Sequence, residues 1–94
     1  MVSTLEMVAF SPQAMQAAAE ARYEAACHAF RAAAPALGLD PETLDAEAFY
    51  ATPYLEDHTL SSAQQLLQRR HWQALRQACR ELLEAYDALA TTVM

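Results

Sequence analysis

The fold of this chain is decided by the stretch SPQAMQAAAEARYEAACHAFRAAA, which covers residues 11–34. Alanines recur in it at intervals of three and four residues, the spacing that places side chains on one face of an α-helix. We call this set the alanine stripe, and it consists of Ala14, Ala18, Ala21, Ala25, Ala29 and Ala32. Because each of these side chains is a single methyl group, another helix can approach the face closely. The stripe therefore predicts a helix that packs against a second helix, in the same chain or in another copy.

The ends of this first helix are marked by proline. Ser11 followed by Pro12 combines a hydroxyl cap with proline at the first helical position. Pro35 disfavours helical geometry in the residue before it, so we expect the helix to cover residues 12–34. The helix also carries a second apolar face at helical spacing, formed by Met15, Ala19, Tyr23, Ala26, Phe30 and Ala33. Two apolar faces predict contact with two neighbours.

A short helix is expected in the middle of the chain. Gly38 suits a left-handed turn after the first helix, and Asp40 with Pro41 repeats the cap-and-proline signal. We expect a helix over residues 41–50 that ends before Pro53. Its buried side chains are predicted to be Leu44, Ala48 and Phe49, and the loop after it is predicted to be anchored by Tyr54, Leu55 and Leu60.

The last helix is predicted to cover residues 62–91. Ser61 and Ser62 each precede a glutamine by three residues, so either serine could form the N-terminal capping box. One line of this helix is apolar and consists of Leu67, His71, Leu75, Ala78, Leu82, Tyr86 and Leu89, and it is widened on one side by Trp72, Cys79 and Leu83. This surface is wider than one antiparallel partner needs to cover.

These elements predict an all-α fold, in a single helical domain over residues 1–94. Only one glycine is present, and alanine-rich composition favours helix. We expect an antiparallel hairpin of two long helices with the short helix between them. Two such hairpins would associate into a dimeric four-helix-type bundle, because one hairpin cannot cover all of its apolar faces. For residues 1–10 we expect either a short helix or an extended arm, and no signal peptide.

Charge and cysteine content restrict the function and the compartment. The net charge of −6 argues against general nucleic-acid binding, since that function requires a basic surface. All six basic residues are arginines, which suggests GC-rich bacterial or phage coding. Two cysteines are too few for a typical disulfide-stabilised scaffold. We therefore expect a reduced, cytoplasmic protein, and no stretch is apolar enough for a membrane span.

The sequence offers little for catalysis. Cysteine and histidine lack the spacing of metal ligands, and neither a phosphate-binding loop nor a nucleophile elbow is present. We therefore expect no metal, no cofactor and no enzyme activity. Glu56, Asp57 and His58 form the run best suited to acid–base chemistry, but a solvated acidic loop is the favoured interpretation, since the sequence shows no pocket around them. His71 is expected to be a hydrogen-bonded interior or interface histidine.

The remaining features suggest surfaces for another protein. Candidate acidic contacts are Asp45, Glu47, Glu56 and Asp57, and candidate basic contacts on the last helix are Arg69, Arg76 and Arg80. Trp72 borders the apolar line, where it can serve the core or an interface. The plainer interpretations are solubility for the acidic residues and ion pairing between the two sets. We expect a small acidic, non-catalytic protein that binds and modulates a larger protein as inhibitor, adaptor or chaperone. The alternatives are a permanent subunit of a larger complex, and a small-ligand-binding helical bundle or enzyme.

Overall fold

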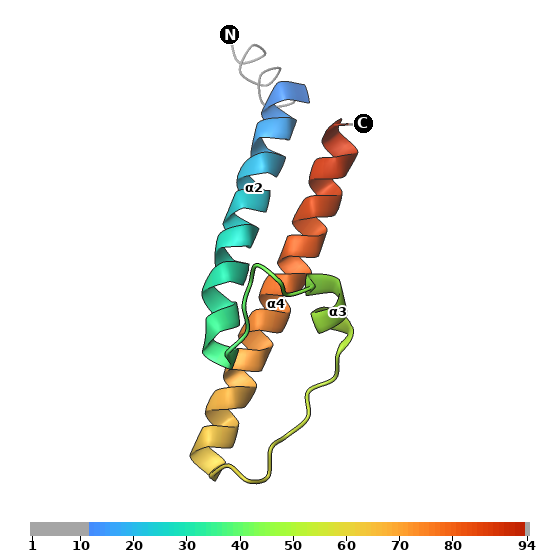
Figure 1. Ribbon diagram of the computed structural model, residues 1–94. Coiled ribbons are helices and arrows are strands. Elements are labelled where there is room, and N and C mark those ends of the chain that lie inside the picture. Colours follow the sequence, from blue (N-terminus) through green and yellow to red (C-terminus); the bar gives the residue numbers. More distant parts are fainter. Residues whose placement is uncertain (1–11, 94) are drawn as a thin grey trace.

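The computed structural model describes residues 12–93, which form helices and loops with no strand among them (Figure 1). The elements in chain order are α2 (Pro12–Ala33), the 3-10 helix η1 (Ala34–Leu37), α3 (Ala46–Ala51) and α4 (Ser62–Val93). α2 and α4 lie side by side in opposite directions, and α3 lies against α4 (Figure 1). The predicted all-α class, with two long helices and a short one, is confirmed. The expectation for residues 1–10 falls outside the described residues.

The turn after α2 follows the sequence signals closely. The α-helix ends at Ala33, within one residue of the end predicted from Pro35, and residues 34–37 continue as one turn of 3-10 helix. Gly38 ends this turn with φ 71° and ψ 21°, the left-handed conformation that side chains with a Cβ rarely adopt. Its N–H donates to the carbonyl of Pro35 at 2.9 Å. The role predicted for Gly38 is confirmed.

The short helix begins later than predicted, so its expected start at Pro41 is wrong. Residues after Asp40 form only one turn, in which Asp40 Oδ1 accepts from the N–H of Glu42 at 3.0 Å. Asp45 then takes an extended conformation and caps α3, with its Oδ1 accepting from the N–H groups of Glu47 and Ala48. Asp45 is thus a stronger cap than Asp40, although only Asp40 is followed by proline, because the carboxylate of Asp45 accepts from two backbone N–H groups that have no partner within the helix.

Ser61 is the residue that caps α4. Its hydroxyl accepts from the N–H of Gln64 at 3.2 Å, and its own N–H donates to Gln64 Oε1 at 3.0 Å. This reciprocal pair is the capping box that the sequence left open between two serines. α4 then continues to Val93, and its first turns extend beyond the end of α2 (Figure 1).

The core lies where the end of α2 meets η1, α3 and the middle of α4. It is formed by Phe30, Ala34, Phe49, Leu75, Ala78 and Cys79. α2 contributes through its second apolar face, on which Ala26 and Phe30 are buried. The alanine stripe points elsewhere: Ala18, Ala21, Ala25, Ala29 and Ala32 are exposed, and Ala14 is half-buried. The prediction that the stripe packs against another helix of the same chain is therefore wrong. The opposite face packs against α4 instead, because its larger side chains bury more apolar area.

Several other side chains expected inside are exposed. Leu55 has 81% of its surface exposed, so it does not anchor its loop, and Ala48 lies on the outer side of α3. Met15, Leu67 and Tyr86 each keep more than half of their surface exposed. Both cysteines are free, and burial of Cys79 raises the pKa of its thiol to about 11. Over residues 12–93, no helix has both the length and the apolarity required to cross a membrane.

Candidate binding cleft

Aromatic side chains gather where the chain leaves α3 and passes α4. Trp72 lies 4.4 Å from Phe49 and 5.4 Å from Tyr54 between ring centroids, the second pair in an edge-on arrangement. One turn further along α4, the guanidinium of Arg76 lies over the ring of Tyr50, 4.4 Å from its centroid. These separations are those of favourable aromatic and cation–π contacts. Phe49 belongs to the core, while the other four side chains continue from it to the surface.

A cleft of about 490 Å³ opens between these side chains, and we call it the aromatic cleft. Its lining consists of Tyr50, Ala51, Thr52, Pro53, Tyr54, Trp72, Gln73 and Arg76. The lining contains one cation and no carboxylate. It therefore differs in charge from the chain as a whole, which carries −6.

Several polar groups of the aromatic cleft are free to bind, although the hydroxyl of Thr52 donates to the carbonyl of Ala48 at 2.8 Å. Among the described residues, no hydrogen bond engages the indole N–H of Trp72 or the hydroxyls of Tyr50 and Tyr54, and these atoms reach solvent. Arg76 forms no ion pair with a carboxylate within residues 12–93. Its cation–π contact with Tyr50 is not a hydrogen bond to a carboxylate, and a guanidinium carries five N–H donors, so donors stay available.

The other predicted basic contacts are occupied. Arg69 forms an ion pair with Glu56 across the loop, and Arg80 Nε donates to Glu84 Oε1 at 3.1 Å one turn along α4. The hydrogen bond to Glu84 raises the pKa of Arg80 above its usual value. Of the three arginines predicted as contacts, only Arg76 thus faces a cleft with free donors.

The predicted acidic contacts mainly shape the backbone. Asp45 caps α3, as described above, and Glu47 is an exposed residue in its first turn. Asp57 Oδ1 accepts from the N–H of Thr59 at 3.0 Å and from its hydroxyl at 2.5 Å, which together lower the pKa of Asp57. Together with the Glu56–Arg69 pair, these bonds hold the loop that leads into α4.

The run Glu56, Asp57 and His58 is not assembled as a reactive site. Two of its members hold the loop, and His58 is exposed. Within residues 12–93, no group of three or more His, Cys, Asp or Glu side chains is placed to hold a metal ion.

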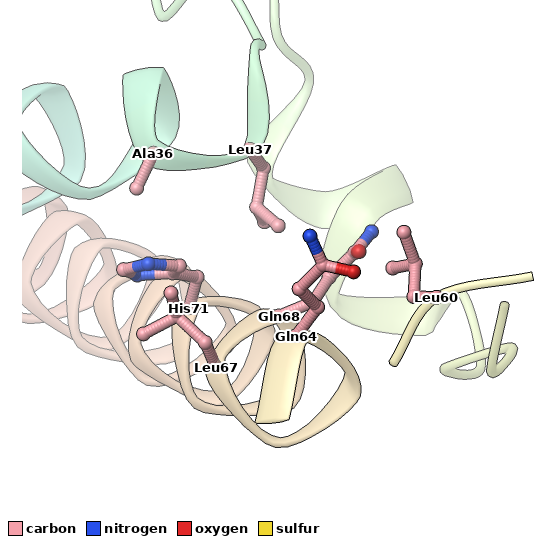
Figure 2. A pocket seen from close by; sticks show the side chains of 7 residues that line it. All are labelled: Ala36, Leu37, Leu60, Gln64, Leu67, Gln68 and His71. Atoms are coloured by element: carbon pink, nitrogen blue, oxygen red, sulfur yellow. The ribbon is translucent and has the colours of Figure 1, made fainter. Parts of the chain in front are cut away.

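A second cleft, of about 370 Å³, lies where α4 extends past η1 (Figure 2). Ala36, Leu37, Leu60 and Leu67 supply its apolar wall, and Gln64, Gln68 and His71 its polar groups. Gln64 is engaged in the capping box. His71 is half-buried and has no hydrogen-bond partner among the described residues, so the predicted hydrogen bond is absent there. This cleft has fewer free donors than the aromatic cleft, and neither an arginine nor a carboxylate lines it.

Trp72 and Arg76 were predicted as partner contacts, whereas Tyr50 and Tyr54 were missed as site residues. The signal was present as two tyrosines flanking Pro53, together with Trp72 and Arg76 four residues apart on one helix face. What the sequence could not provide was the path of the loop that brings the two pairs together.

Comparisons of the chain with protein-family models, with curated proteins and with solved structures found no match.

Proposed function

We propose that this protein is a small non-catalytic binding protein that modulates a larger protein partner, as an inhibitor, adaptor or chaperone. The observation that carries the proposal is the aromatic cleft, where Trp72 and Arg76 meet two tyrosines and keep free donors. Tryptophan, tyrosine and arginine are the side chains enriched at the energetic centres of protein interfaces. Binding is favoured over catalysis because the carboxylates that could act as acid or base hold backbone turns and ion pairs.

A partner capture with matched variants tests this proposal. The tagged chain is used as bait in extract of the source cells, beside Arg76→Glu and the control Arg70→Glu. Arg70 is an exposed arginine of the same helix that lines no part of the aromatic cleft. We expect one stoichiometric partner with the original chain and with the control, and its loss with Arg76→Glu. Equal capture by both variants would contradict the role of the cleft, and no partner with any bait would contradict the function.

We further propose that two copies associate through the alanine stripe into a four-helix-type bundle. The stripe is exposed from Ala18 to Ala32, and Ala29 and Ala32 line a groove of about 480 Å³ between the two long helices. The groove is completed by Ala33, Ala74, Gln77, Ala78 and Glu81. Methyl-lined surfaces allow close approach of helix backbones, which favours a second copy as the occupant. The same exposed faces would suit the alternative function, a permanent subunit of a larger complex.

The free thiols of both cysteines are compatible with a reduced, cytoplasmic location.

A further inference from the structure

The aromatic cleft has the chemistry to recognise one class of peptide. Its walls are the rings of Tyr50, Tyr54 and Trp72, and Pro53 lines it between the tyrosines. Aromatic-walled grooves of this kind accept proline-rich segments in the polyproline II conformation, whose rings pack on the flat faces. We infer that the cleft binds an extended, proline-containing peptide segment with an acidic side chain; this inference rests on the proposed function.

The free donors of the cleft match the acceptors of such a segment. A polyproline II strand has no internal hydrogen bonds, so its carbonyl groups need partners. The indole N–H of Trp72 and the hydroxyls of Tyr50 and Tyr54 can donate to these carbonyls, since none of the three is engaged within the described residues. A proline-rich segment has few backbone N–H groups and presents mainly carbonyl acceptors, which match a cleft that offers mainly donors.

Arg76 selects the acidic side chain. Its guanidinium carbon lies 4.4 Å from the centroid of the Tyr50 ring, a cation–π contact that restrains the side chain, and it forms no ion pair within residues 12–93. A free guanidinium can donate two parallel N–H bonds to one carboxylate. No acidic residue lines the cleft to compete for these donors. A nucleic acid would also stack on aromatic rings and contact arginine, but the net charge of −6 repels a polyanion more strongly than a peptide with one carboxylate.

Trp72 is the only tryptophan of the chain, so its fluorescence reports on the aromatic cleft directly. The probe is a capped pentapeptide of four prolines around a central glutamate, and its twin carries glutamine instead. Both are titrated into the original chain, into Arg76→Gln and into the control Arg70→Gln, with helicity checked by circular dichroism. We expect the glutamate peptide to bind the original chain and the control about fivefold tighter than its twin, the size typical of a partly exposed ion pair. With Arg76→Gln the two peptides should bind equally, which isolates the arginine–carboxylate contact.

Three results would overturn the inference: no change in Trp72 emission with either peptide, equal affinity of the twins for the original chain, or tighter binding of a single-stranded oligothymidylate than of the glutamate peptide. The outcome is separable from that of the proposed function. If the peptides fail but partner capture still depends on Arg76, the inference falls and the function stands. If the peptides bind as expected and no partner is captured, the inference stands and the function falls.

Discussion

Helix α2 has two apolar faces with the same helical spacing, and only one of them forms the core. The inner face buries Ala26 and Phe30 and carries half-buried Tyr23, whereas the alanine stripe is exposed for most of its length. Periodicity is equal on both faces, so periodicity alone does not choose between them. The difference is apolar area per residue: each buried methylene contributes about 0.8 kcal/mol, so a face with an aromatic ring gains more from contact than a face of methyl groups.

The inner face can be tested by weakening the core that it joins. Leu75 is 0% exposed and contacts this core from α4. Leu75→Ala should lower the free energy of unfolding by about 3 kcal/mol, the usual cost of a truncated core leucine. Urea unfolding followed by circular dichroism measures the change. Leu66→Ala on the same helix is the matched control, because Leu66 is 48% exposed and should lose much less. Similar losses for both variants would contradict the assignment of the core.

The outer face can be tested through self-association. Ala25 lies mid-way along the stripe and is exposed. Ala25→Glu should weaken a dimer by tenfold or more while leaving monomer stability nearly unchanged, since about 1.4 kcal/mol corresponds to that factor and a charge buried at an interface costs at least as much. Sedimentation equilibrium at micromolar concentrations measures the constant. The control Ala48→Glu changes an exposed alanine on α3, away from the stripe. A strictly monomeric original chain at high micromolar concentration would contradict the dimer.

The smallest effect is expected at the border between the two faces, where Arg22 Nε donates to Glu81 Oε1 at 2.8 Å. This bond lowers the pKa of Glu81 and raises that of Arg22. Because the folded pKa of Glu81 lies below its ordinary value of 4.5, the stabilisation is present above that value and is lost as pH falls through the folded pKa. Arg22 stays charged throughout. Glu81→Gln should therefore reduce the difference in melting temperature between pH 7 and pH 3.

The side chains of this pair are 44% and 41% exposed, so the effect should be small and should shrink further in high salt. Glu24→Gln is the control on α2, since Glu24 takes part in no ion pair among the described residues. An unchanged acid dependence in Glu81→Gln would show that the pair contributes nothing to folding.

Local signals in the sequence were sufficient for much of the fold. Pro12, Gly38 and Ser61 mark helix ends because each acts through its own backbone or the next turn, which needs no knowledge of distant residues. The start of α3 was misplaced for a related reason. Asp40 and Pro41 carry the stronger local signal, but Asp40 accepts from one N–H group, whereas Asp45 accepts from two and caps α3.

The sequence by itself determined that the chain is helical, where its two long helices begin and end to within two residues, and that Trp72 and Arg76 lie four residues apart on one helix, because all of these follow from interactions within a few residues. Only the tertiary structure decided which face of α2 is buried, that Arg69 is already paired with Glu56, and that Tyr50 and Tyr54 join Trp72 in one cleft. The physical reason is that these outcomes depend on the path of the loop after α3 and on competition for a small amount of buried area. Neither is encoded in the spacing of residues along the chain.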